Sequence, residues 1–295
     1  MIEGALAQVR SFNRLVVQRV GALDDRYLTR NRPLGEARVL WEIGADGCDV
    51  RALRSRLGLD SGYLSRLLRS LEAAALVTVA ARTDDRRVRT ATLTHAGLAE
   101  RALLERRSDD LARSFLEPLG EQAQQRLVAA MAVVEQLLTA GLVDIDVVDP
   151  GTPGAQYCVG EYFAELAARF PTGFDPALSI PAELDELRPP AGMFLLATLR
   201  GEPVGCGALK LHGEQPAELK RMWVAASARG LGLGRRLLCE LERHAAAAGV
   251  AAVRLETNKS LTEAIALYRS AGYCEVEAFN DEPYAQHWFE KELAR

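Results

Sequence analysis

Residues 229–236 read RGLGLGRR, and they stand between a strand-like stretch and a helical one. The strand-like stretch is ELKRMWV at 218–224, and the helical pattern runs from about Leu233 to Ala248, where Gly249 ends it. Glycine lets the backbone come close to a ligand, and the free amides at the start of a helix attract anions. The segment therefore predicts a phosphate-binding turn between a strand and a helix.

Several interpretations of these glycines compete. A Walker loop needs Lys and then Ser or Thr after its last glycine, and Arg235 and Arg236 exclude it. A Rossmann loop needs a third glycine at position 235, which is arginine, although Glu256 ends the next strand about where a ribose-binding acid would lie. A turn without a ligand is also open, but three glycines at a helix start are unfavourable without a further reason.

The remaining pattern, R-G-x-G-x-G after a strand, resembles the pyrophosphate loop of GNAT-type N-acetyltransferases. The flanking sequence agrees, because LETNKSLTEAIALYRSAGY at 255–273 and FNDEPYAQHWFEKEL at 279–293 resemble the later elements of that family. The similarity covers about residues 142–295 and is weakest over 155–190, which usually line the acceptor site. The resemblance implies an α/β fold with a mixed, mostly antiparallel sheet, acetyl-CoA as co-substrate and an amine as acceptor.

The resemblance also implies which residues bind acetyl-CoA. The loop amides would hold the pyrophosphate, Met222 and Val224 would offer backbone groups to the pantetheine arm, and the Val224 amide would polarise the thioester carbonyl. Asn258 would bond the pantetheine, unless it is an ordinary turn residue. The expected set is Met222, Trp223, Val224, Arg229, Gly230, Leu231, Gly232, Leu233, Gly234, Arg235 and Asn258. No metal is expected.

Two residues are candidates for proton transfer. Tyr268 occupies the family's position for the acid that protonates the thiolate, although it shares a helical face with Ile265 and could be a core residue. Glu218 stands where some relatives carry a catalytic base, and strand alternation places it on the same face as Met222 and Val224. An exposed strand charge, with a proton relay through water, is the alternative for Glu218.

The first part of the chain predicts a helix-turn-helix. One helix spans 34–43, a short one ends at Gly58, and a third opens at Asp60 or Ser61 as its cap. The third helix carries one apolar stripe, which consists of Leu64, Leu67, Leu68 and Leu71. Its opposite face is polar and carries arginine, as in a helix that reads the major groove. TDDRR at 83–87 then separates two β-runs and predicts a wing with arginine at its tip.

This segment, SGYLSRLLRSLEAAALVTVAARTDDRRVRTATLTHAG, resembles the recognition helix and wing of MarR-type winged-helix regulators. The resemblance covers roughly residues 5–140 and implies a homodimer that binds a pseudo-palindromic operator in double-stranded DNA. Long helices at 96–115 and 121–139 would pair across the dimer. Ser61, Tyr63, Ser65, Arg66 and Arg69 would face the major groove, Arg87 would enter the minor groove, and Asp85 or Asp84 would brace the wing.

The whole chain fits two domains, expected at 1–141 and 142–295. Its 295 residues contain no run long enough to span a membrane and no signal pattern, so we expect a cytoplasmic protein. Residues 1–145 carry a net charge of +2 (21 Arg, 19 acidic), and 146–295 carry −6 (15 basic, 21 acidic). We expect a DNA-binding regulator that is also an acetyl-CoA-dependent N-acetyltransferase. A regulator whose second domain senses acetyl-CoA or another ligand without turnover is the alternative.

Overall fold

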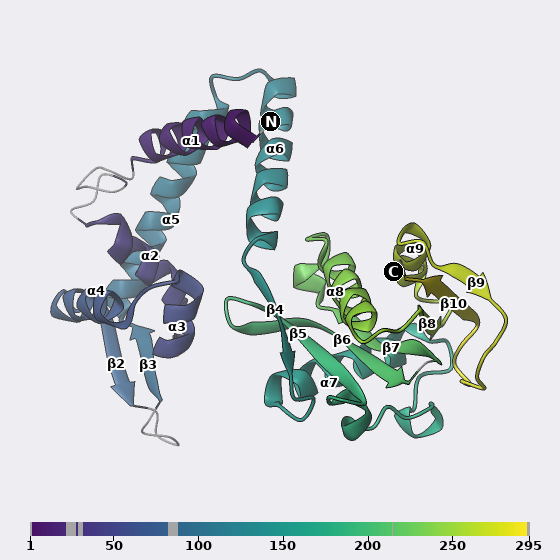
Figure 1. The fold of residues 1–295 in the computed structure, drawn as a ribbon. Helices are drawn as coiled ribbons and strands as arrows, with labels where there is room; N and C mark the ends of the chain where they lie inside the picture. Colours follow the sequence, from purple (N-terminus) through teal and green to yellow (C-terminus); the bar gives the residue numbers. More distant parts are fainter. Residues whose placement is uncertain (1, 22–27, 29–31, 82–87, 214, 294–295) are drawn as a thin grey trace. The chain divides into compact units, whose positions relative to one another are not determined.

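The computed structural model describes residues 2–21, 28, 32–81, 88–213 and 215–293, and Figure 1 shows the course of the chain. The chain divides into two compact units, Met1–Ala130 and Met131–Arg295. The division falls inside one helix, α6 (Glu121–Ala140). The sequence predicts a boundary at 141/142 because the helical pattern gives way to a strand there. The division between the compact units lies about ten residues earlier, and a division within a continuous helix leaves no mark in the sequence.

The first unit combines helices with a small sheet. Its three strands pair in the order β1-β3-β2, and both pairings are antiparallel. The elements before α6 are α1 (Ile2–Arg19), α2 (Leu34–Ile43), β1 (Cys48–Asp49), α3 (Val50–Leu57), α4 (Ser61–Ala73), β2 (Val77–Ala81), β3 (Arg89–Leu93) and α5 (His95–Leu116). Helix–turn–helix followed by a hairpin confirms the predicted winged helix.

Helix α4 forms for the reasons that its sequence suggests. The Asp60 side chain caps it by accepting a hydrogen bond from the Tyr63 amide at 2.9 Å. Gly58, in the left-handed conformation, ends the helix before it. The four stripe leucines are buried in the core of the first unit, together with Leu40 and Leu53. The core therefore holds α4 by one face and leaves the arginine-bearing face in solvent.

The second unit is built on a seven-stranded sheet. The strand order is β4-β5-β6-β7-β8-β10-β9, and only the β7–β8 pair is parallel. The elements are β4 (Val143–Val148), α7 (Pro153–Arg169), β5 (Gly192–Leu199), β6 (Glu202–His212), β7 (Gln215–Val224), α8 (Leu233–Ala247), β8 (Ala252–Thr257), α9 (Thr262–Ser270), β9 (Cys274–Val276) and β10 (His287–Glu292). The mixed, mostly antiparallel sheet is as predicted.

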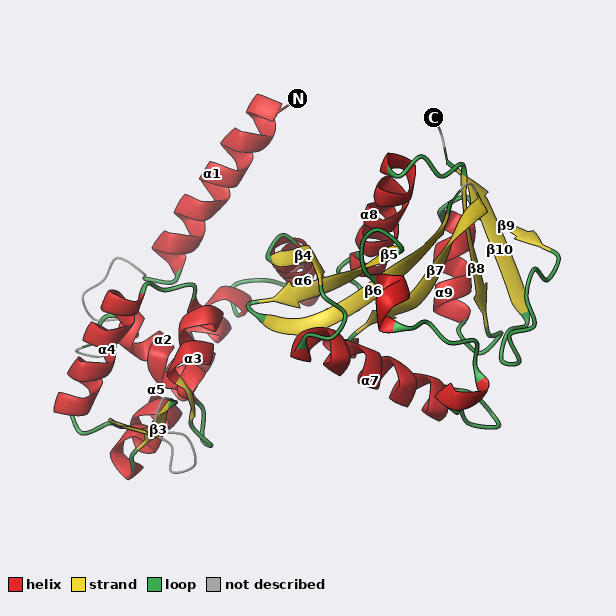
Figure 2. Ribbon diagram, turned by 60° about the horizontal axis from the view of Figure 1, so that its bottom comes forward, coloured by secondary structure: helices red, strands yellow, loops and turns green. Residues whose placement is uncertain are grey.

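Helices cover both faces of this sheet. Figure 2 shows α7 on one face and α8 with α9 on the other. The α7 face packs a small core that includes Cys158, Phe194 and Trp223. The opposite face packs a larger core that includes Leu219 and Leu237. In the described part of the chain, no helix combines the length and apolar character that a membrane crossing requires.

A bulge in β7 reverses the faces of this strand near its end. Between the pairs Ala208–Lys220 and Cys206–Trp223, β7 carries one residue more than β6, and Arg221 there has φ +56°. As a result Leu219 packs in the larger core, whereas Trp223 packs in the smaller one. Strand alternation read from the sequence misses this reversal.

We predict that Leu71→Ala destabilises the first unit by about 2–5 kcal/mol, because it leaves a cavity at a fully buried position. The matched control is Leu98→Ala, which removes the same atoms from a side chain that is 41% exposed and costs less than about 0.5 kcal/mol. Hydrogen exchange of the α2 and α4 amides measures both effects. Equal protection in the two variants would contradict the assignment of the core.

Candidate functional site

The candidate site lies where β7 and β8 separate. These parallel strands are in register at Ala217–Val253 and Glu218–Arg254, before the bulge at Arg221. Two cavities lie beside the end of β7 and share six wall residues. These are Tyr162, Leu166, Met222, Leu261, Ala264 and Tyr268. The two cavities are therefore adjacent compartments of one candidate site.

The larger compartment, here the loop cavity, measures about 540 Å³ and opens onto the glycine-rich loop. The end of β7, the loop, the start of α8, and parts of α7 and α9 line it. The expected cofactor residues in its wall are Met222, Trp223, Val224, Arg229, Gly230, Gly232, Leu233, Gly234 and Arg235. Leu231 instead packs against the core, and Asn258 lines the smaller compartment.

The glycines give the loop its conformation. Gly230 has φ +79°, and Gly232, which caps the N-terminus of α8, has φ +72°. A side chain in this region is strained. Among the described residues, no side chain caps the N-terminus of α8, and a Cβ at Gly232 would meet no atom within 4 Å. Open space therefore lies in front of unpaired helix amides, which is the geometry that an anionic group needs.

The opposite side of the loop is fixed by residues far away in the sequence. Gln136 in α6 donates a hydrogen bond to the Gly230 carbonyl. Arg236 in α8 donates to the carbonyls of Ala140 at 2.7 Å and Val143 at 2.8 Å. These bonds satisfy carbonyl groups behind the loop while its amides stay open, so the end of α6 helps to shape the cavity.

The two loop arginines are already engaged by side chains. Arg229 pairs with Glu165 of α7 at 2.5 Å, and Arg235 donates to the Ser270 hydroxyl at 2.5 Å. Glu165 also accepts from the Trp223 indole at 3.0 Å and pairs with Arg169 at 3.2 Å. Arg229 therefore offers the loop cavity its backbone amide more readily than its charge.

Tyr268 lies in the shared wall, and it is also a core residue. Its side chain is 6% exposed, and its ring packs against Tyr273 and Phe289. Burial raises the pKa of its hydroxyl well above the usual range, and Tyr162 and Glu256 raise it further. The hydroxyl therefore keeps its proton at neutral pH, as a general acid must.

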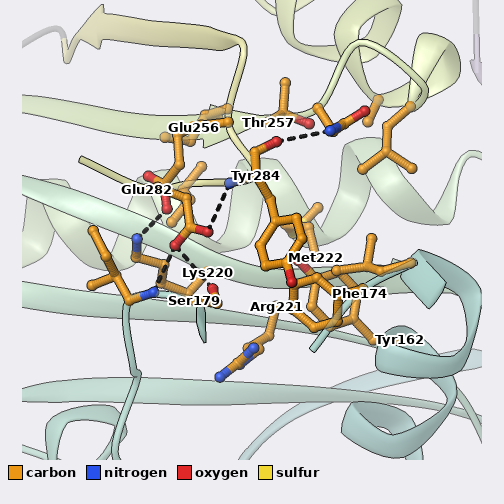
Figure 3. A pocket seen from close by; sticks show the side chains of 18 of the residues that line it. Tyr162, Phe174, Ser179, Lys220, Arg221, Met222, Glu256, Thr257, Glu282 and Tyr284 are labelled. Carbon is orange, nitrogen blue, oxygen red and sulfur yellow. Dashed lines mark hydrogen bonds and ion pairs between the residues drawn. The ribbon is translucent and has the colours of Figure 1, made fainter. Parts of the chain in front are cut away.

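The smaller compartment, here the acceptor cavity, contains charged residues that the sequence did not assign to this site. Lys220 pairs with one carboxylate oxygen of Glu256, while the other oxygen, Oε2, is buried and has no hydrogen-bond partner among the described residues. Glu282 accepts bonds from the Ser179 hydroxyl at 2.9 Å and the Ile180 amide at 2.7 Å (Figure 3). Arg221 also lines this cavity.

Aromatic rings form much of the rest of the acceptor cavity. The rings of Phe174 and Tyr284 are tilted against each other with centroids 4.8 Å apart, and Phe170 packs on both. Asn258 donates to the Tyr284 carbonyl at 2.8 Å and accepts from the Ser260 amide at 2.9 Å. The Asn258 side chain thus holds the segment that carries Tyr284, and both the nitrogen and the oxygen of its amide form hydrogen bonds within the protein.

Glu218, the predicted base, lies outside the walls of both cavities. It pairs with Arg254 at 2.7 Å and lies 3.5 Å from Lys220. Burial would raise the pKa of Glu218, but the Arg254 hydrogen bond and the nearby positive charges outweigh it and lower the pKa. Its predicted alignment with Met222 and Val224 is wrong, because the bulge turns those two residues toward the larger core.

In the first unit, the predicted DNA-reading residues of α4 lie on its exposed face. Ser61, Tyr63, Ser65, Arg66 and Arg69 all belong to this face. The Arg66 guanidinium lies 5.6 Å from the centre of the Tyr63 ring. The wing residues Asp84, Asp85 and Arg87 lie outside the described residues.

Comparison with known proteins agrees with this two-part architecture. Residues 161–273 match the acetyltransferase (GNAT) family, and residues 28–87 match the MarR family. Two separate segments of the chain thus match two different families.

Two relatives share the second part. An IAA acetyltransferase of Azospirillum brasilense is 43% identical over 103 residues, which are 35% of this chain and 66% of that protein. An uncharacterized N-acetyltransferase of Schizosaccharomyces pombe is 33% identical over 97 residues, which are 32% of this chain and 60% of that protein. The chain thus spans slightly less than two thirds of either relative.

Solved structures resemble parts of the chain. A putative acyl-CoA N-acyltransferase from Klebsiella pneumoniae is 28% identical, with a TM-score of 0.42 and coverage of 52% of this chain and 99% of that one. A probable transcriptional regulator from Pseudomonas aeruginosa is 23% identical, with a TM-score of 0.38 and coverage of 43% and 96%.

Proposed function

We propose that the protein is a DNA-binding transcriptional regulator whose second unit transfers an acetyl group from acetyl-CoA to an amine. The observation that carries the transferase proposal is the open glycine loop beside a cavity whose wall includes Tyr268, which burial keeps protonated. A family match over residues 161–273 and the names of both relatives support it.

The loop cavity fits the pyrophosphate and pantetheine of acetyl-CoA. The amides at Gly230, Gly232 and Gly234 would bind the phosphates at the start of α8. The end of β7, freed from β8, would present the backbone of Met222 and Val224 to the pantetheine arm. Bound acetyl-CoA would supply the thioester, whose carbonyl carbon takes the new bond to nitrogen while its C–S bond breaks.

The protein's own part in the chemistry is to hold and move protons. An acceptor amine must lose a proton before it attacks. Glu256 lines the acceptor cavity, and its buried Oε2 has no hydrogen-bond partner among the described residues, so Glu256 is the candidate base. Tyr268 gives its proton to the departing thiolate. The proton taken by Glu256 returns to Tyr268 through water, which restores both groups and balances the reaction.

The first unit would bind DNA through α4. Its arginine face is exposed and the leucine stripe anchors the other face, so the helix can enter a major groove without disturbing the core. The exposed arginines also provide phosphate contacts.

A homodimer would cover apolar side chains that the chain exposes on its helices. Helix α1 exposes Leu6, Val9, Phe12 and Leu15, each by more than 40%. Helix α6 similarly exposes Val128, Met131, Val133, Leu137 and Leu138. Clusters of this kind indicate interfaces, and a dimer would place two α4 helices on a pseudo-palindromic operator.

Gly232→Ala should weaken acetyl-CoA binding by about tenfold or more, because a side chain would strain the loop and enter the cavity. Gly249→Ala is the matched control. It follows the end of the same helix with φ +81°, also has open space for a Cβ, and lies outside both cavities. Calorimetric titration measures both variants. Equal affinities would remove the loop from the acetyl-CoA site.

Tyr268→Phe should lower kcat by about 100-fold or more, because the thiolate loses its acid. Tyr273→Phe, a buried neighbour outside both cavities, should leave kcat nearly unchanged. Because burial raises the pKa of Tyr268 above its ordinary value of 10.0, wild-type kcat should show no alkaline decline below that pH. Free-thiol release across a panel of amines measures each effect. Acetyl-CoA binding without any release would instead favour a ligand sensor.

Arg66→Ala should weaken binding to the DNA upstream of the protein's own gene by roughly tenfold. The dependence of log K on log salt should become shallower by about 0.9 if Arg66 contacts one phosphate. Arg113→Ala, an exposed arginine on α5 that pairs with Asp110, is the control. Gel shift at several salt concentrations measures both. Unchanged binding by the Arg66 variant would exclude this face of α4.

A further inference from the structure

The acceptor cavity contains a cation without a counter-ion. The Arg221 guanidinium lies 4.4 Å from the centre of the Phe163 ring and 5.9 Å from that of Tyr162. Among the described residues, no carboxylate lies within 4.0 Å of it, and Figure 3 draws no ion pair to it. Burial lowers the pKa of Arg221 below its usual value. The protein thus keeps a partly buried positive charge beside the rings of Phe163 and Tyr162, and of these two rings Tyr162 lines the cavity.

The same cavity contains an anion without a counter-ion. Glu282 is 8% exposed, and its oxygens accept bonds from the Ser179 hydroxyl and from the amides of Ile180 and Tyr284. All three donors are neutral, and no cationic side chain lies within 4.0 Å among the described residues. Figure 3 shows these bonds converging on Glu282. They hold the carboxylate in one orientation without a contact ion pair, while Arg221 attracts it from beyond that distance.

Other buried charges nearby are paired. Lys220 pairs with Glu256, and Arg254 pairs with Glu218. A buried charge that lacks a counter-ion is costly to keep. Arg221 and Glu282 attract each other across this small cavity without forming a contact ion pair, which is best explained by a ligand that bridges the two charges.

We propose that the acceptor is a free amino acid, bound by its carboxylate at Arg221 and by its ammonium group at Glu282. This proposal rests on the acetyl transfer proposed above. Phe170, Phe174 and Tyr284 form an aromatic wall that suits an apolar or aromatic side chain. The cavity, about 90 Å³ against about 540 Å³ for the loop cavity, suits a small acceptor.

The charged residues of the cavity also suit acetyl transfer to the ammonium group of an amino acid. The ammonium group binds at Glu282, loses one proton toward Glu256, and attacks the thioester carbon as a neutral amine. The N–C bond forms as the C–S bond breaks, and the thiolate takes its proton from Tyr268. The product is an amide without positive charge, so its attraction to Glu282 falls and it can leave.

The test compares sets of three acceptors: L-phenylalanine, its amide and phenethylamine, and likewise L-leucine, its amide and isoamylamine. Free-thiol release gives kcat/KM for each. The ammonium group of the amide is the more acidic, because it has no neighbouring carboxylate. A site indifferent to the carboxylate would therefore favour the amide. We expect the free amino acid to be preferred by on the order of 100-fold.

Arg221→Gln should lower kcat/KM for the amino acid by on the order of 100-fold, mainly through KM, and leave the amide and the amine within about twofold. Position 221 keeps its backbone strain in this variant, since Gln also carries a side chain. Glu282→Gln should lower kcat/KM for all three acceptors alike. Arg269→Gln is the control, because Arg269 also lies over an aromatic ring but pairs with Glu275 outside both cavities.

Three outcomes would overturn the proposal: equal or better activity with amides and amines, an equal loss for all acceptors in Arg221→Gln, or the same loss in Arg269→Gln. If no acceptor releases thiol, the transferase proposal fails. Calorimetry of the CoA-saturated protein then still decides whether the cavity binds a free amino acid. L-Phenylalanine or L-leucine that binds wild type but not Arg221→Gln would support the carboxylate site. Absence of binding of both amino acids to wild type would exclude it.

Discussion

The bulge at Arg221 is the constraint on which the second unit depends. One extra residue in β7 reverses the side-chain alternation, so that Trp223 packs under α7 while Met222 and Val224 face the α8 side. In the same place β7 parts from β8, with which it is in register only at its start. The bulge thus opens the sheet, separates the two cores and brings Lys220, Arg221 and Met222 to one cavity wall.

The glycine-rich loop depends on support from behind as much as on its own conformation. Gln136 and Arg236 satisfy backbone carbonyls at the loop and at the end of α6, so the open groups on the cavity side are amides. Helix α6 contributes residues to both units of the chain. The helix that would pair two copies of the protein therefore also supplies a contact to the loop that would bind acetyl-CoA.

Local signals predicted the elements well because the interactions that fix them are local. Asp60 caps α4, Gly58 ends α3, and the leucine stripe has the period of a helix, so each of these is legible within a few residues. The same holds for the glycine loop, where the strand, the turn and the helix follow directly in sequence. Tyr268 proved to be both a core residue and a cavity residue, a combination that helical spacing alone does not resolve.

The sequence by itself determined the resemblance to two families, the order of the elements and the position of the glycine-rich loop. Only the tertiary structure decided which residues line the smaller cavity, where we propose that the acceptor binds. Glu218 does not line the cavity with Met222, because a bulge breaks the strand alternation, and it pairs with Arg254 instead. Glu256 and Glu282 do line the cavity, because different elements of the fold bring them together. Whether a charge forms an ion pair depends on contacts between residues distant in sequence. Only the folded structure therefore shows that Arg221 and Glu282 lie in one cavity without a contact ion pair.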